Sequence, residues 1–358
     1  MSRFFSTRHR GLEPYVPGEQ PKDMKYIKLN TNESPFPPSP GVVKAAAEEA
    51  EKLRIYSDPE CGLLTEKLAE VYGVGRDRVI VSNGSDEVLN FAFMAFADEK
   101  NPLIFADITY GFYPVFAELN HIPYEEISLR EDFSINPEDY KNAGRTIVIA
   151  NPNAHTGLGM SLGDIEDIVR TNPDNIVIID EAYVDFGTES ALPLTASYDN
   201  LLIIRTFSKS YSLAGARLGF AIGNEALIRD LNTIKYSVNP YNVNRMTCAA
   251  GYAALCENDY YRKNCEKIVV NRRYTIDALK ELGFSVIESK ANFVLAKSDR
   301  IGGQKLYTKL KERGILVRHF SKEQIEDYNR ITIGSREEMD ILVENIKKIL
   351  EEADEQNL

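Results

Sequence analysis

Six short apolar runs recur along the first 223 residues, and none shows the alternation of polar and apolar residues that a half-exposed strand has. They span 78–82, 101–107, 145–151, 175–180, 200–207 and 217–223. Most are followed by a stretch of helical character, such as SDEVLNFAFMAFA after the first run. Unalternating runs of Val, Ile and Leu are typical of strands buried on both faces. The sequence therefore predicts an α/β fold with a mainly parallel sheet sandwiched by helices.

The chain changes character at both ends. Residues 1–40 hold seven prolines, which predicts an arm, and the first helix is expected to begin at Ser39 and Pro40. A second helix is expected to end at Gly73. Beyond residue 255 a long charged helix precedes short strand-like pieces at 284–289, 292–297, 315–319 and 330–334 and a last helix with the capping-box pair Ser335 and Glu338. We predict an N-terminal arm (1–40), a large domain (41–255) and a small α+β domain (256–358).

Charge and cysteine usage limit the partners. The net charge of −12 argues against nucleic acid or an anionic membrane as a partner. The four cysteines show no CxxC spacing and are interpreted as reduced thiols. No stretch approaches the roughly 18 apolar residues of a membrane span, and the N-terminus lacks an apolar signal core. A cytoplasmic protein without a bound metal is expected.

Side chains that can bind anions or take part in catalysis follow directly after several of the predicted strands. They are Ser85 and Asp86 after Gly84, Asp180 after NIVII, and Thr206, Ser208, Lys209 and Arg217 around the fifth and sixth runs. Each has an ordinary interpretation alone: a helix cap, a structural ion pair or a solvated turn. Because the ends of parallel strands meet at one edge of a sheet, we expect them to lie together.

Together these side chains fit one cofactor. A helix start rich in free N–H groups, two hydroxyls and a guanidinium suit a phosphate. A buried carboxylate such as Asp180 needs a cationic partner, and a partly desolvated lysine such as Lys209 can form a Schiff base. Pyridoxal phosphate needs an anion site, a carboxylate at its pyridinium nitrogen and a reactive lysine. The sequence thus predicts a pyridoxal-phosphate enzyme.

Two nucleotide-binding alternatives fit poorly. The glycines of TGLGMSLG are spaced GxGxxxG, one residue too long for a dinucleotide fingerprint. The chain has no GxxxxGK[ST] motif, which excludes a P-loop ATPase.

The same segments resemble the fold-type I pyridoxal-phosphate enzymes of aminotransferase class I/II, and within them the histidinol-phosphate aminotransferases. The resemblance spans nearly the whole chain and rests on LNTNESPF, SNGSDEVLNFAFMAFAD, DITYGFYPVFAELN, NPNAHTG, IIDEAYVDF, RTFSKSYSLAGARLGF and NRITIGSREE. It implies a seven-stranded sheet, pyridoxal 5′-phosphate as cofactor and a homodimer with shared active sites.

The resemblance also implies roles for single residues. Lys209 would carry the Schiff base, Asp180 would bind the pyridine nitrogen, and Tyr183 would bind O3′. Further cofactor contacts would come from Ser85, Asp86, Tyr110, Asn153, Thr206, Ser208, Arg217 and, from the partner subunit, the residue at Tyr56. Substrate contacts would come from Tyr15, Asn32, Arg330 and Arg318.

One motif departs from the family pattern. The family usually shows NPTG, whose asparagine binds O3′, whereas this chain has Ala154, His155, Thr156 and Gly157. Asn153 or His155 is a candidate to compensate.

The substrate expected from the resemblance is L-histidinol phosphate, with imidazole acetol phosphate as its oxo form and glutamate/2-oxoglutarate as the second pair. Arg330 would bind the carboxylate of one substrate and the phosphate of the other. A threonine-phosphate decarboxylase-like lyase and an aminotransferase for aromatic or other amino acids are alternatives. A non-enzymatic regulator would need an added DNA-binding module, which the acidic chain does not suggest.

Overall fold

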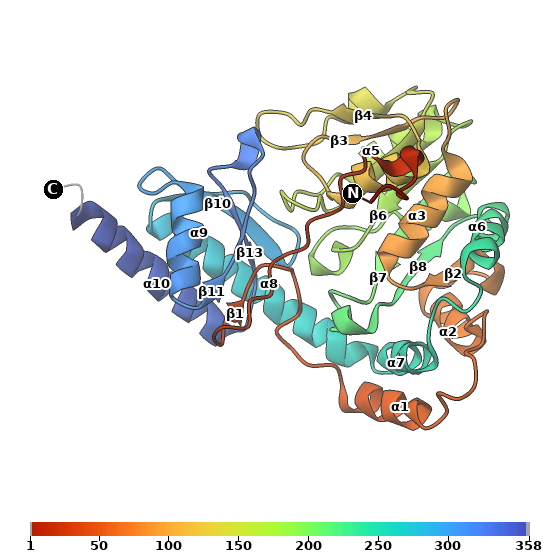
Figure 1. Cartoon of the computed structure of the whole chain (residues 1–358), viewed down its shortest axis with the longest axis horizontal. Coiled ribbons are helices and arrows are strands. Elements are labelled where there is room, and N and C mark those ends of the chain that lie inside the picture. The colour runs from red at the N-terminus through yellow and green to blue at the C-terminus, as the bar shows by residue number, and fades with distance from the viewer. Residues whose placement is uncertain (1, 356–358) are drawn as a thin grey trace.

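The computed structural model describes residues 2–355 and contains a large seven-stranded sheet covered by helices (Figure 1). Its strands are β2 (Val79–Ser82), β3 (Leu103–Ala106), β4 (Tyr124–Ile127), β5 (Thr146–Ala150), β6 (Val177–Asp180), β7 (Leu201–Thr206) and β8 (Gly219–Ile222). Their order is β2-β8-β7-β6-β5-β3-β4, and only β8 runs antiparallel to its neighbours. The predicted α/β class with a mainly parallel sheet is confirmed.

Helices cover both faces of this sheet. They are α1 (Pro40–Ala50), α2 (Gly62–Tyr72), α3 (Ser85–Phe96), α4 (Phe112–Asn120), α5 (Leu162–Thr171), α6 (Glu225–Val238) and α7 (Arg245–Cys256). Successive residues of one strand serve opposite layers: Ile178 packs with α3, α4 and α6, whereas Val177 and Ile179 pack with α5. Every residue of β6 is buried, which is why its sequence does not alternate.

Helix α1 begins at Pro40 as predicted, but one strand of the large sheet was not predicted and one expected side-chain cap is absent. Strand β4 was not expected, because its sequence YEEI is polar and half-exposed at the edge of the sheet. Ser39 precedes α1 but makes no capping hydrogen bond, because its hydroxyl accepts one from Tyr261 at 3.2 Å. The expected end of α2 at Gly73 is confirmed, with that glycine in the left-handed conformation.

The C-terminal part begins with a long helix and holds a second, antiparallel sheet. Its elements are α8 (Asn258–Glu281), β9 (Phe284–Val286), β10 (Phe293–Ser298), α9 (Gly303–Glu312), β11 (Ile315–Leu316), β12 (Arg318–His319), β13 (Asn329–Thr332) and α10 (Arg336–Glu355). The sheet order is β12-β13-β10-β9. The capping box before α10 is present, since the Ser335 and Glu338 side chains each accept from the other's backbone N–H.

The expected strand at 315–319 is two strands that pair with different partners. β12 joins the small sheet, whereas β11 pairs in parallel with β1 (Ile27–Lys28) of the N-terminal segment. In Figure 1 this segment passes from beside the large sheet to β11. Short 3-10 turns complete the structure at Thr7–His9, Arg76–Arg78, Pro137–Tyr140, Val184–Phe186, Leu192–Ala196, Ala214–Ala216 and Glu323–Ile325. Within residues 2–355, no helix has the length and apolar character needed to cross a membrane.

Candidate active site

A cavity of about 430 Å³ opens at the edge of the large sheet where β5, β6 and β7 end. Nine of the predicted cofactor residues line it: Ser85, Asp86, Tyr110, Asp180, Tyr183, Thr206, Ser208, Lys209 and Arg217. Gln20, Thr31 and Glu33 of the N-terminal segment line it too.

The strand register brings these residues together. Asp180 ends β6 opposite Ala150 of β5 and Ile204 of β7, so its carboxylate lies at the carboxyl edge of the sheet. Antiparallel β8 starts at this same edge, with Gly219 opposite Thr206. The chain from Lys209 to Arg217, eight residues later, therefore forms a loop whose two ends return to one site.

Two glycines allow the start of α3 to approach β8 closely. A Cβ atom on Gly219 would lie 2.4 Å from the backbone nitrogen of Ser85. A Cβ atom on Gly84, whose φ is +82°, would lie 2.6 Å from the guanidinium of Arg217. The N–H groups that begin a helix attract anions, so α3 and Arg217 can bind the same anion.

Asp180 is a buried carboxylate without a positive partner. Tyr113 donates to its Oδ2 at 2.9 Å, and the backbone N–H of Ala182 donates to Oδ1 at 3.1 Å. Burial raises the pKa of Asp180 to about 6. No basic side chain within residues 2–355 forms an ion pair with it. A cationic N–H group in the cavity would complete this site.

Lys209 presents the sole amine that lines the cavity among the residues the structure describes. Its Nζ donates to the carbonyl of Thr31 at 3.2 Å and lies 5.7 Å from the centre of the Tyr183 ring. Within residues 2–355 the Lys209 amine forms no ion pair with a carboxylate. Its position therefore suits a nucleophile better than a member of a structural ion pair.

The side chain of Asp86 organises the anion site instead of binding the anion. Its carboxylate accepts from Tyr110 at 2.7 Å and from Arg217 at 2.8 Å. Burial and the Asp86 charge raise the pKa of Tyr110 well above its usual value, so the phenol stays protonated. Thr206 donates to Ser208 at 2.9 Å on the other side of the site. An anion would thus be bound by backbone N–H groups, hydroxyls and Arg217.

Tyr183 receives a hydrogen bond from Asn32. The Asn32 Nδ2 atom donates to the Tyr183 hydroxyl at 3.0 Å, and Thr332 of β13 fixes the Asn32 amide oxygen at 3.0 Å. Asn32 is buried with a φ of +57°. Thr332, in the C-terminal part of the chain, therefore fixes Asn32 of the N-terminal segment, and Asn32 in turn orients Tyr183 in the cavity.

Asn153, predicted to contact the cofactor, does not line the cavity. Its amide oxygen accepts from Thr109 at 2.7 Å, and its Nδ2 donates to the Ile108 carbonyl at 2.8 Å. Both ends of the amide are therefore used in fixing the loop before α4. The side chain facing the cavity at this turn is Ala154, which offers no polar group.

His155 does not replace the family asparagine either. Its ring packs against Phe320 with the ring centres 4.5 Å apart. Burial and the neighbouring Arg330 lower the pKa of His155 to about 3, so the ring is neutral.

Arg330 lies half-buried beside the cavity, between the aromatic rings of Phe293 and Phe320. It donates to the carbonyls of Ala154 at 3.4 Å and Asn30 at 3.2 Å. Its Nε is buried without a hydrogen-bond partner in residues 2–355, and burial lowers its pKa. A guanidinium that meets only carbonyl oxygens is well suited to take an anion.

The remaining predicted substrate residues are Tyr15 of the arm and Arg318 of β12. Tyr15 stacks on Phe112 at 4.2 Å and lies 6.3 Å from the ring of Tyr110, and burial raises the pKa of Tyr15. Arg318 donates to the backbone carbonyls of Val16 and Pro17 and so ties the arm to the C-terminal sheet. Neither side chain lines the cavity.

Tyr56 lies outside this site. Its side chain is 78% exposed and stacks on Tyr241, with ring centres 4.6 Å apart. Within residues 2–355, Tyr56 forms no hydrogen bond or ring contact with a residue that lines the cavity.

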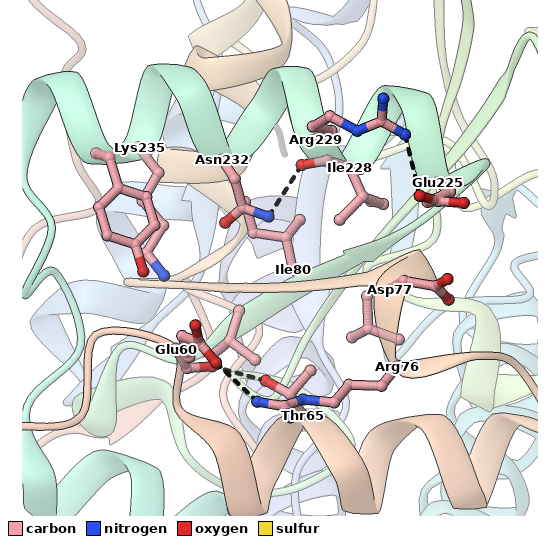
Figure 2. Close-up of a pocket in the computed structure, with 13 residues that line it drawn as sticks. Glu60, Thr65, Arg76, Asp77, Ile80, Glu225, Ile228, Arg229, Asn232 and Lys235 are labelled. Atoms are coloured by element: carbon pink, nitrogen blue, oxygen red, sulfur yellow. Dashed lines mark hydrogen bonds and ion pairs between the residues drawn. The ribbon is translucent and has the colours of Figure 1, made fainter.

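A larger cavity of about 670 Å³ lies between α2, β2 and α6 (Figure 2). Its charged groups are mostly paired with one another, Arg76 with Glu60 at 2.8 Å and Arg229 with Glu225 at 3.0 Å. None of the predicted site residues lines it. The smaller cavity is therefore the candidate active site.

Sequence reasoning missed Tyr113, Thr31 and Glu33. Tyr113 is fully buried and binds Asp180, but its position in an aromatic helix marks it only as core. Thr31 and Glu33 reach the cavity because the N-terminal segment pairs with β11, a contact between distant parts of the chain. The only sequence feature that could have pointed to Thr31 and Glu33 was the LNTNESPF motif, in which both lie.

Comparisons with known proteins agree with this geometry. The family model "Aminotransferase class I and II" matches residues 24–346. A histidinol-phosphate aminotransferase of Brachyspira hyodysenteriae is 51% identical over 98% of this chain and 99% of its own length. One of Clostridium botulinum (strain Langeland) is 46% identical over the same shares. The solved structure of histidinol-phosphate aminotransferase from Sinorhizobium meliloti in complex with pyridoxal-5′-phosphate superposes with a TM-score of 0.85 at 24% identity, covering 92% of each chain. The chain belongs to the class I and II aminotransferase family.

Proposed function

We propose that this chain is a pyridoxal-phosphate-dependent aminotransferase that moves an amino group between L-histidinol phosphate and 2-oxoglutarate, giving imidazole acetol phosphate and glutamate. The curated relatives of 51% and 46% identity carry the name of this activity over almost their full lengths. The observation on this chain that supports it most is the joint lining of one cavity by Lys209, Asp180 and Arg217.

The side chains of the cavity fit the cofactor. Asp180 is a buried carboxylate that lacks a cation, and Tyr113 and the Ala182 N–H fix its direction. It would hold the ring nitrogen and keep it protonated. When bound, pyridoxal phosphate supplies a ring that withdraws electrons from the α-carbon of the substrate amine.

The phosphate would be held where α3 begins. The N–H groups of Ser85 and Asp86, the hydroxyl of Ser208 and the guanidinium of Arg217 converge there. Asp86 keeps Arg217 in place, and its own charge is balanced by Arg217 while Tyr110 donates a hydrogen bond to it. Tyr110 would lie against the cofactor ring.

Lys209 would bond covalently to the cofactor and would move the proton at the substrate's α-carbon. Its Nζ is close to the Tyr183 ring and is restrained only by the Thr31 carbonyl. Tyr183, oriented by Asn32, would bind the O3′ side of the ring in place of the asparagine that Ala154 replaces.

Arg330 would bind the anion of each substrate in turn. Carboxylate and phosphate both present two oxygens to a planar guanidinium. Burial between Phe293 and Phe320 strengthens such a contact, because little water competes with the anion. Tyr15 and Arg318 would close the arm over the bound substrate.

A homodimer with shared sites is part of the proposal. Apolar side chains are exposed on two neighbouring segments and include Leu53 (58%), Ile55 (49%), Tyr56 (78%), Leu63 (73%), Val238 (54%) and Tyr241 (45%). The Tyr56–Tyr241 stack places the two segments side by side. Exposed patches of this kind mark protein interfaces. We propose that Tyr56 reaches the cofactor phosphate of the partner subunit. The four free thiols suit the reducing cytoplasm, where we place the enzyme.

A substrate panel tests the proposed function. Initial rates with 2-oxoglutarate would be measured for L-histidinol phosphate, aromatic amino acids and threonine phosphate. The highest kcat/KM is expected for L-histidinol phosphate. Release of carbon dioxide from threonine phosphate without amino transfer would instead identify a decarboxylase, and a preference for aromatic amino acids would move the assignment to them.

A further inference from the structure

Two cysteines from distant parts of the chain face each other away from the active site. Cys61 directly precedes α2 and Cys248 lies in α7, 187 residues later. The Cys248 thiol donates to the Cys61 sulfur, with the two Sγ atoms 3.1 Å apart. A disulfide needs about 2.05 Å, so small side-chain rotations would close the bond.

The two thiols differ in their ease of ionisation. The hydrogen bond from Cys248, and secondarily the positive charge of Lys235, lower the pKa of Cys61. The same hydrogen bond, together with burial, raises the pKa of Cys248. One sulfur is thus favoured as the nucleophilic thiolate, while its neighbour keeps the proton that a later step requires.

An opening lies next to this pair. Lys235 of α6 is buried and donates to the Pro59 carbonyl at 2.5 Å, two residues before Cys61. Lys235 and Glu60 both line the larger cavity, where Figure 2 labels them. A small oxidant in that cavity would therefore lie beside Lys235 and beside Glu60, the residue directly before Cys61.

We propose that Cys61 and Cys248 form a reversible oxidation site that accepts hydrogen peroxide and closes to an intramolecular disulfide, fixing the segment 51–61 to α7. The Cys61 thiolate attacks one peroxide oxygen, the O–O bond breaks and hydroxide leaves, which gives a sulfenic acid. The Cys248 sulfur then attacks the Cys61 sulfur, and the S–O bond breaks. Water leaves with the Cys248 proton. Two sulfurs are oxidised, two peroxide oxygens are reduced to water, and an external dithiol reverses the change.

The bond would reinforce an existing contact. Arg245 of α7 already donates to the Tyr56 carbonyl at 2.9 Å and to Glu49 at 2.9 Å. A disulfide adds a covalent link between the same segment and the same helix. An effect of the disulfide on cofactor binding rests on the proposed role of Tyr56 in the partner's site. The oxidation of the two thiols does not depend on that role.

Thiol counting tests the chemistry. The reduced protein, with its four cysteines, would be treated with hydrogen peroxide, and free thiols would be counted after denaturation. Two thiols should be lost, peptide mapping should link Cys61 to Cys248, and dithiothreitol should restore all four. The Cys256→Ser/Cys265→Ser double variant is the matched control and should still lose two thiols. Four surviving thiols, or a link to another cysteine, would overturn the proposal.

Two single variants and hydrogen exchange test the remaining steps. In Cys248→Ser, whose hydroxyl can still donate to Cys61, Cys61 should be trapped as a sulfenic acid by dimedone and no intramolecular link should form. Cys248→Ala lacks this donor and should form the dimedone adduct more slowly. Both variants would be checked for native circular dichroism. In the oxidised native protein, backbone amides of 51–61 should exchange several-fold more slowly than in the reduced protein. Unchanged exchange would contradict the tether, and it would do so whether or not the protein is an aminotransferase.

Discussion

At the scale of single residues, the site combines charges that lack partners of opposite sign. The buried Asp180 meets only a phenol and a backbone N–H, and the half-buried Arg330 meets only carbonyl oxygens. Burying an unpaired charge costs free energy, so such groups are retained where a ligand completes them. A cofactor nitrogen at Asp180 and a substrate anion at Arg330 would supply both partners.

Replacing Lys209 by Ala should remove the cofactor's covalent attachment and the proton carrier together. We expect the absorbance of the lysine-bound cofactor to disappear and kcat to fall by about 10³-fold or more. Spectra and initial rates check this. Lys347→Ala, at an exposed site of α10, is the control and should behave as the native protein. An unchanged spectrum in the Lys209 variant would refute the assignment of the cofactor.

Asp180 should make the stability of the cofactor-free protein depend on pH. Its folded pKa of about 6 lies above the ordinary value of 3.8, so the folded state binds the proton more tightly than the unfolded state. This contribution is fully present below pH 3.8 and is lost as pH rises through 6. The loss amounts to up to about 3 kcal/mol. Denaturant unfolding at pH 5 and pH 7 would measure about 1.3 kcal/mol of this loss.

The matched control for this pH dependence is Asp180→Asn. The amide does not titrate, so the variant should lose less free energy of unfolding between pH 5 and pH 7 than the native protein. Saturating pyridoxal phosphate should remove the difference in free energy of unfolding between pH 5 and pH 7 that Asp180 causes in the native protein. It should not have this effect on Asp180→Asn. Equal pH dependence of the two cofactor-free proteins would contradict the account of Asp180.

At the scale of elements, the site depends on how strands and helices meet. The sequence was sufficient to predict the buried strands, because their apolar runs must be covered on both faces. It was insufficient for β4, whose polar sequence pairs only at an edge, and for the split of 315–319 between two sheets. The seven strand-end residues were predicted to gather, and all seven line one cavity. Tyr110 and Tyr183, which were expected from the family resemblance, line it too. The use of Asn153 in a loop and the bond from Asn32 to Tyr183 depend on tertiary contacts that no local pattern reports.

Gly219→Ala tests the close approach of β8 and α3. The added Cβ would lie 2.4 Å from the Ser85 nitrogen, so α3 must shift away from Arg217. We expect cofactor affinity to fall about tenfold and stability to fall by about 1–3 kcal/mol. Fluorescence titration and urea unfolding measure these. Gly302→Ala, where an added Cβ meets nothing within 4 Å, is the control. Native cofactor affinity in Gly219→Ala would show that the tight approach is unnecessary.

At the scale of the whole molecule, the arm, the large sheet and the C-terminal sheet contribute to one site. Lys209 follows β7, Thr31 belongs to the N-terminal segment, and Arg330 lies on β13. The division into three units at residues 40 and 255 stays a prediction, as does the homodimer. A partner subunit leaves little trace in one sequence beyond exposed apolar residues such as Tyr56 and Leu63.

Hybrid dimers test the shared site. Lys209→Ala and Tyr56→Ala subunits would each be inactive or weakly active alone, because every site in them lacks one group. Mixed and refolded together, they should regain up to about a quarter of native activity, since part of the sites then hold both groups. Light scattering would confirm the dimer. Absence of any recovery in mixed dimers would place Tyr56 outside the partner's site.

The central claim is that L-histidinol phosphate gives its amino group to the cofactor held by Lys209 and Asp180. The most direct measurement mixes the cofactor-loaded protein with L-histidinol phosphate alone, without an oxo acid. One imidazole acetol phosphate should form per active site while the cofactor is converted to its amine form, and 2-oxoglutarate should then reverse the change in the spectrum. No oxo product and an unchanged cofactor spectrum would contradict it.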